Sequence, residues 1–133
     1  MARETVADMP EWCTVEVAMS VLGGKWKMLI VKYLLDGACR FGALQRALPG
    51  ITHRMLSRQL RELEADGIVA RRAYAQVPPK VEYSLTPIGA QLCGVSSALE
   101  EWGGRYRRAA SAAAPAAGRA AGGAPEPGGT SGD

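Results

Sequence analysis

One stretch, THRMLSRQLRELEADG at residues 52–67, constrains the fold more than any other part of the chain. At about 100° per residue, a helix would place its leucines on one face and its arginines roughly opposite. These residues are Leu56, Leu60 and Leu63, and Arg54, Arg58 and Arg61. Thr52 suits the N-cap of such a helix, and Gly67 suits its end. The pattern predicts a helix that buries its leucines in a core and exposes a row of positive charge.

Shorter helices are predicted before this stretch. Residues 13–24 (CTVEVAMSVLGG) end at a glycine pair, and residues 25–37 (KWKMLIVKYLLDG) end with Gly37 as a C-cap. Residues 40–50 (RFGALQRALPG) predict a third helix that turns Leu44 and Leu48 inward and is ended by a Pro-Gly pair. In the second of these helices, helical spacing predicts one apolar face, made of Trp26, Leu29, Ile30, Tyr33 and Leu34.

After Gly67 the spacing of apolar residues changes from helical to alternating. Residues 68–74 (IVARRAY) and 80–85 (KVEYSL) alternate in the manner of strands, and the prolines of the linking AQVPP suit the tip of a hairpin. Residues 86–108 then predict one continuous helix with Thr86 as its N-cap. Its large apolar residues form a single stripe, made of Ile88, Leu92, Val95, Leu99, Trp102 and Tyr106.

Composition assigns the two ends of the chain. Residues 109–133 are mostly alanine, glycine and proline, so they cannot bury enough apolar surface to order themselves and are expected to be disordered. Residues 1–12 are expected to form a flexible N-terminal segment. One domain, residues 13–108, remains between them, which is a size that supports a modest core.

Several classes of function are disfavoured by residue type. An enzyme is not expected, because His53 is the one histidine and no nucleophile–base pair or Gly-rich phosphate loop is present. Cys13, Cys39 and Cys93 lack Cys-x-x-Cys spacing, so no disulfide framework, metal site or cofactor is expected. No apolar run reaches the length of a membrane span, and residues 1–12 lack the order of a signal peptide, so a cytoplasmic protein is expected.

The order of the elements predicts a mainly α fold with a small β-hairpin, a winged helix-turn-helix. In that motif the second helix presents its outer face to the DNA major groove, with its N-terminal residues nearest the bases. Arginine suits this position, because its guanidinium can hold guanine bidentately or bind a phosphate. The predicted DNA contacts are Thr52, His53, Arg54, Ser57, Arg58 and Arg61 on the helix, and Lys80 on the hairpin.

Other interpretations of the same residues stay open. Arg58 with Glu62, and Arg61 with Glu64, have the spacing of ordinary surface ion pairs. The alternative function is a winged helix that makes only protein contacts, without specific DNA binding. The formal net charge of +3 is too small to decide, although residues 21–48 carry five basic residues against one acidic residue.

Long segments of the chain resemble the HxlR-type family of bacterial transcriptional regulators. They are CTVEVAMSVLGGKWKMLIVKYLLDG, RFGALQRALPGIT, MLSRQLRELEADGIVARRAYAQVPPKVEYSLTPIGAQL and LEEWG, within residues 13–103. The resemblance implies a homodimer with added N- and C-terminal dimerisation helices, which binds a two-fold operator on double-stranded DNA. The implied interface lies within residues 15–22 and 88–106, and its candidates are Val17, Leu92, Val95, Leu99, Trp102 and Tyr106.

Some members of that family sense oxidants or electrophiles through a cysteine just before the first helix, and Cys13 matches that position. A helix N-terminus favours the thiolate, whereas Glu11 and Glu16 oppose it. Cys13 is therefore a candidate redox sensor, with a small packing residue as the alternative. Cys93, beside the apolar stripe, is interpreted as a packing residue. The resemblance does not identify an effector.

Overall fold

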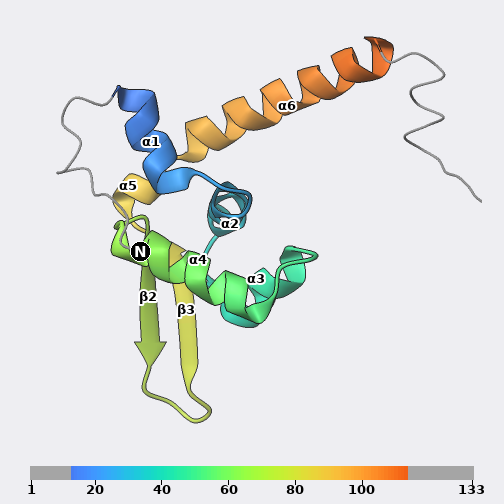
Figure 1. Ribbon diagram of the computed structural model, residues 1–133. Coiled ribbons are helices and arrows are strands. Elements are labelled where there is room, and N and C mark those ends of the chain that lie inside the picture. Colours follow the sequence, from blue (N-terminus) through green and yellow to red (C-terminus); the bar gives the residue numbers. More distant parts are fainter. Residues whose placement is uncertain (1–12, 114–133) are drawn as a thin grey trace, which may run out of the picture. The chain divides into compact units, whose positions relative to one another are not determined.

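In the computed structural model, residues 13–113 are described (Figure 1). The predicted N-terminal segment, residues 1–12, and residues 114–133 of the predicted tail lie outside the described residues. The chain divides into two compact units between Ser96 and Ser97, and each is described by itself. No helix within residues 13–113 is both long and apolar enough to cross a membrane.

The described part of the first unit, residues 13–96, contains five helices, a three-stranded sheet and the start of a sixth helix. The helices are α1 (Thr14–Leu22), α2 (Lys27–Leu34), α3 (Phe41–Ala47), α4 (His53–Ala65), α5 (Pro87–Ala90) and α6 (Cys93–Ala113). The strands are β1 (Cys39–Arg40), β2 (Val69–Tyr74) and β3 (Lys80–Leu85). Residues 97–113 of α6 form the described part of the second unit. The mainly α fold and the predicted hairpin are confirmed.

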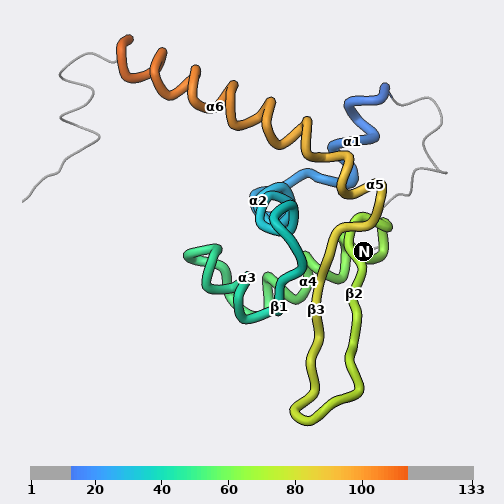
Figure 2. Tube along the Cα trace, turned by 180° about the vertical axis from the view of Figure 1, so that it is seen from behind, coloured from blue at the N-terminus to red at the C-terminus, as the bar shows by residue number. Residues whose placement is uncertain are grey.

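The sheet is antiparallel, with strand order β1-β3-β2 (Figure 2). The hairpin register pairs Val69 with Leu85 at its base and Tyr74 with Lys80 near its tip. The short strand β1 pairs with β3 on the side opposite β2, and its Arg40 lies opposite Glu82. Sequence reasoning missed β1, because two residues are too few to show an alternating pattern.

The core lies where α2, α3 and α4 pack together against the base of the sheet. Each fully buried aliphatic side chain contributes roughly 1.5–3 kcal/mol through removal of its surface from water. The buried apolar residues are Trp26, Ile30, Val31, Leu34, Leu44, Leu48, Ile51, Leu56, Leu60, Leu63, Ile68 and Val69. The three leucines of α4 are therefore in the core as predicted.

The predicted apolar face of α2 was partly wrong. Leu29 and Tyr33 are 38% and 37% exposed, whereas Val31 and Lys27 are buried. The sequence of α2, KMLIVKYL, is apolar on nearly every side, so spacing alone leaves its inward direction poorly defined. Contacts with α3, α4 and β3 select the face that includes Ile30 and Leu34.

The predicted single helix from Thr86 is two helices. Thr86 is an N-cap as expected, since its side chain accepts a hydrogen bond from the Gly89 backbone N–H at 3.2 Å. The short helix α5 then closes with the Leu92 N–H donating to the Gly89 carbonyl at 3.0 Å, and α6 begins at Cys93. The helix α6 continues to Ala113, so the predicted disordered tail does not begin at Ala109.

Candidate nucleic-acid interface

The helix α4 is capped and oriented as its sequence predicts. Thr52 is the N-cap, and its hydroxyl oxygen accepts a hydrogen bond from the Met55 backbone N–H at 3.1 Å. Leu56, Leu60 and Leu63 are buried at 1% exposure or less, which fixes the rotation of the helix about its axis. The opposite side, which carries the arginine row, consequently faces outward.

The arginines of α4 make few polar contacts within residues 13–113. Within residues 13–113, neither Arg54 nor Arg58 takes part in an ion pair, and both side chains are exposed. Arg61 donates a hydrogen bond to the Ser57 hydroxyl at 2.8 Å. Together with Met55, the three arginines line a shallow hollow on this face. The arrangement leaves several guanidinium donors available to an anionic partner.

The surface ion pairs considered as an alternative for this helix are not formed in the described part of the chain. Glu62 instead accepts a hydrogen bond from the Lys27 ammonium on α2, at 2.6 Å. A carboxylate that sequence spacing assigned to the arginine row thus binds a cation from another helix. The interpretation of the row as an ordinary paired surface loses its specific support.

His53 is positioned by an aromatic contact that its sequence did not reveal. Its ring lies 4.5 Å from that of Phe41, between centroids, with the planes tilted by 44°. Phe41 is the first residue of α3, so the contact ties the beginning of α4 to the helix before it. His53 remains exposed at the N-terminal end of α4, where a helix-turn-helix meets the bases.

Lys80 on the hairpin is held by neighbours. Its ammonium lies 3.2 Å from a carboxylate oxygen of Glu82 and 4.8 Å from the ring centroid of Tyr74. The Tyr74 hydroxyl donates to the other Glu82 oxygen at 3.0 Å, and the Arg72 guanidinium lies 4.8 Å from the same ring. These contacts lower the pKa of Glu82, first through the hydrogen bond with Lys80 and then through that with Tyr74.

The wing cluster consists of Arg72, Tyr74, Lys80 and Glu82. The sequence selected Lys80 and allowed at most one of Arg71 and Arg72 to reach DNA, because alternation sends these two to opposite faces, but it did not select Tyr74 or Glu82. The signal was present in the alternation of the two strands, because Arg72 and Tyr74 lie two residues apart, as do Lys80 and Glu82. The register places each of the first pair opposite one of the second. The wing therefore presents its cations around an aromatic ring and not as separate charges.

Comparison with known proteins agrees with this geometry. The model of the HxlR-like helix-turn-helix family matches residues 21–111. The chain belongs to the HxlR-like family. The resemblance inferred from the sequence, and the winged helix-turn-helix architecture, are thereby confirmed.

HxlR-like relatives resemble the chain along most of its length. The HTH-type transcriptional regulator YybR of Bacillus subtilis is 54% identical over 101 residues, which cover 76% of this chain and 81% of YybR. The solved structure of the redox regulator HypR in its reduced form is 49% identical, with a TM-score of 0.71, and covers 75% of this chain and 99% of its own. YodB of B. subtilis in reduced form is 38% identical, with a TM-score of 0.62, covering 68% and 90% respectively.

The oxidised form of HypR and diamide-treated YodB have also been solved. They are 53% and 36% identical to this chain, with TM-scores of 0.67 and 0.61. The oxidised HypR covers 70% of this chain and 96% of its own, and the treated YodB covers 72% and 96%. This HxlR-like protein is a helix-turn-helix transcriptional regulator, and DNA binding is favoured over a winged helix that makes only protein contacts.

The candidate dimer residues of this HxlR-like protein fall into two groups. Val17 and Leu92 are half-buried and line one apolar hollow, together with Val95, between α1, α5 and the start of α6. Leu99, Trp102 and Tyr106 are exposed along α6, as is Val95. The rings of Trp102 and Tyr106 stack with their centroids 5.3 Å apart. The exposed fractions are 43% for Val95, 51% for Leu99, 59% for Trp102 and 60% for Tyr106.

The interface candidates chosen from the sequence omitted two apolar side chains that α1 exposes. Val15 is 68% exposed and Met19 is 57% exposed, and they lie four residues apart on one face of the helix. The sequence carried this signal in the spacing of the two residues, but Val17 was selected from the same segment. Val15 and Met19 are therefore two further candidates for interface residues.

The three cysteines differ in environment. Cys13 is the exposed N-cap of α1, and its backbone N–H donates to a Glu16 carboxylate oxygen at 3.0 Å. Cys93 is exposed, so its interpretation as a packing residue was wrong. Cys39 is half-buried, and its pKa is raised, mainly by desolvation and further by Asp36 and Glu82. Cys39 therefore carries less reactive thiolate than an unperturbed thiol.

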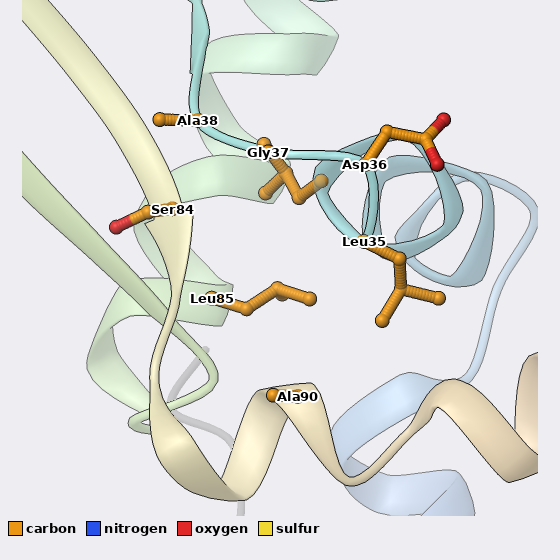
Figure 3. A pocket seen from close by; sticks show the side chains of 8 residues that line it. Leu35, Asp36, Gly37, Ala38, Ser84, Leu85 and Ala90 are labelled. Atoms are coloured by element: carbon orange, nitrogen blue, oxygen red, sulfur yellow. The ribbon is translucent and has the colours of Figure 1, made fainter.

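Within residues 13–113, no group of three or more His, Cys, Asp or Glu side chains is close enough to hold a metal ion. A hollow between the end of α2, β3 and α5 is lined mainly by Leu34, Leu35, Leu85 and Ala90 (Figure 3). The polar groups of Asp36 and Ser84 point away from the side chains of Leu35 and Leu85 (Figure 3).

Proposed function

We propose that this regulator is a homodimer in which α4 of each protomer reads one half of a two-fold operator. The observation that carries the proposal is the exposed row of Arg54, Arg58 and Arg61, which lies opposite the buried leucines and makes no ion pair within residues 13–113. Thr52, His53 and Ser57 supply further hydrogen-bonding groups toward the N-terminal end of the same helix. Two such helices would lie about 34 Å apart on DNA, one helical turn.

The wing supports this proposal with a separate contact. Lys80, Tyr74 and Arg72 form a cationic surface at the hairpin, which suits the phosphate backbone beside the groove. Glu82 neutralises part of that charge, so the wing contributes a modest, sequence-independent attraction.

Regulation through Cys13 is the second part of the proposal. The thiol is exposed at the N-terminus of α1, and the similarity of the chain to the redox regulator HypR and to diamide-treated YodB supports a role for oxidation. An adduct at this position would change the packing of α1, whose Val15 and Met19 are available to a partner subunit. Movement of one subunit against the other would then alter the spacing of the two α4 helices.

Selection of a preferred duplex from random sequences, followed by binding measurements on that duplex and on a random one, tests the proposal. Arg54→Ala and Arg58→Ala should each cost about 1–3 kcal/mol on the selected duplex and far less on the random one. Lys80→Ala should weaken both duplexes similarly and reduce the slope of log K against log salt by about one. Arg108→Ala is the matched control, because it removes one exposed arginine that belongs neither to α4 nor to the implied interface segments. Equal losses on both duplexes for the α4 variants would show that this helix does not read sequence.

A further inference from the structure

A buried ammonium at the beginning of α2 stands out among the charged groups. Lys27 is the first residue of α2 and is 6% exposed, and its ammonium lies 2.6 Å from a carboxylate oxygen of Glu62 on α4. The N-terminus of a helix carries partial positive charge, so a cation there is electrostatically disfavoured. Burial adds a desolvation cost. Both effects raise the free energy of a lysine at this position. We therefore ask what the ion pair provides that an apolar contact would not.

Stability alone is a weak explanation of the pair. Replacement of a buried ion pair by well-packed apolar residues is often neutral or stabilising, whereas the directional hydrogen bond of the pair can set the register of two packed elements. Glu62 lies one helical turn after Arg58 and directly follows Arg61, so its attachment constrains the rotation of the arginine row. The buried leucines on the opposite face set the approximate rotation of α4 about its axis. The 2.6 Å contact between Lys27 and Glu62 restricts that rotation further.

Base recognition by α4 requires a precise rotation of the helix about its axis. A rotation of α4 by about 20° would displace a guanidinium lying roughly 6 Å from the helix axis by about 2 Å. A hydrogen bond to a base edge spans only about 3 Å, so a displacement of that size breaks it. Non-specific attraction to phosphates, which depends on charge over longer distances, would change little.

The same segment of the chain also supports the start of α4. Trp26, immediately before Lys27, is buried, and its ring lies 4.0 Å from the place where a Cβ on Gly50 would stand. Gly50 belongs to the turn that leads into Thr52, and its φ of 93° is a conformation that glycine adopts readily. Trp26 therefore supports the turn before α4, while Lys27 holds the helix at its third turn.

We propose that Lys27 and Glu62 are positioning residues for DNA recognition, which orient α4 so that its arginines meet the base edges. This inference rests on the proposed function, since it assumes that α4 reads sequence. It assigns to the pair a role in specificity that is separable from folding.

The test compares the full chain with the double variant Lys27→Met/Glu62→Met, which leaves the net charge unchanged. The measured quantities are the melting temperature and the ratio of affinities for a selected duplex and a random duplex of equal length. The melting temperature should stay within a few degrees of the wild type, while the affinity ratio should fall about ten-fold, the equivalent of one lost base contact. The matched control is Lys32→Met/Asp36→Met, which replaces two exposed and oppositely charged residues, leaves the net charge unchanged and should leave the ratio unchanged.

Arg58→Ala in the same assay separates the two proposals. If Arg58→Ala lowers the ratio and the double variant does not, the positioning role is wrong and the reading role of α4 stands. If neither lowers it, both are wrong. Should the double variant fail to fold, Glu62→Gln decides, because it keeps the shape of the side chain and removes its charge; a ratio reduced about three-fold supports the inference, and an unchanged ratio overturns it.

Discussion

The close approach of Gly89 to the backbone of Ile68 predicts that alanine at position 89 lowers the stability of the fold. Gly89 is buried in α5, and a Cβ built on it would lie 2.3 Å from the Ile68 carbonyl oxygen and 3.2 Å from the carbon of that group. The neighbouring atoms belong to the backbone, so no side-chain rotation can relieve the clash. The same carbonyl accepts hydrogen bonds from the Thr86 backbone N–H at 3.0 Å and from the Thr86 hydroxyl at 3.1 Å.

The expected cost of Gly89→Ala follows from these contacts. The helix α5 must retreat by about 1 Å, and such overpacking costs roughly 1–3 kcal/mol. Weakening of the two Thr86 hydrogen bonds adds about 1 kcal/mol each at most, whereas the better helix propensity of alanine returns about 1 kcal/mol. The contributions sum to a loss of about 0–4 kcal/mol, centred near about 2, and for a domain of roughly 100 residues a loss of about 2 kcal/mol lowers the melting temperature by roughly 8–16 °C.

Gly94→Ala is the control with the opposite sign. Gly94 lies in the first part of α6 and is exposed, and a methyl group added to it would meet no heavy atom within 4 Å. Alanine there should raise the free energy of unfolding by up to about 1 kcal/mol. Circular dichroism melts of both variants at one fixed protein concentration measure the difference, since self-association makes the melting temperature depend on concentration. A Gly89→Ala variant that melts at or above the wild type would refute the close packing of α5 on the sheet.

Other predictions concern assembly, the tail and the thiols. Leu99→Asp or Trp102→Asp should give monomers in sedimentation experiments, because each places a charge in the proposed interface; a wild-type monomer at micromolar concentration would contradict the dimer. Truncation after Ala113 should leave the melting temperature unchanged within a few degrees, because residues 114–133 contain no large apolar side chain. Cys13→Ser should bind DNA normally when reduced and ignore diamide in a gel shift, whereas serine at the other two cysteines should respond like wild type; a response that persists in Cys13→Ser would rule this thiol out. Iodoacetamide should label Cys39 more slowly than the two exposed thiols in peptide mapping, because its raised pKa lowers the thiolate fraction near neutral pH.

The elements that the sequence predicted well are those in which several local signals agree. In α4, the leucine spacing, the Thr52 cap and Gly67, whose φ is 77°, all indicate one helix with the observed limits. The hairpin was equally clear, because the change from helical to alternating spacing coincides with turn residues on both sides. The exposure of the arginine row follows from the burial of the leucines on the opposite face. It could therefore be predicted without knowledge of the tertiary contacts.

The elements that were missed depend on contacts distant in sequence. Strand β1 exists because Cys39 and Arg40 pair with Tyr83 and Glu82, and two residues carry no periodic signal of their own. The break between α5 and α6 accompanies the approach of Gly89 to Ile68, which no local pattern records. The exposed position of Leu29 likewise reflects which neighbours α2 meets, and not its composition.

The pairing of Glu62 shows how such distant contacts bear on function. Helical spacing offers Glu62 to Arg58, four residues earlier, and that pair would have neutralised part of the proposed DNA-contacting face. The structure instead pairs Glu62 with Lys27, thirty-five residues away in sequence, and the two side chains are 31% and 7% exposed. The carboxylate is thereby directed toward α2, and Arg58 makes no ion pair within residues 13–113. A single long-range pair thus both orients α4 and preserves the positive charge of the arginine row, two conditions that sequence-specific binding by this helix requires.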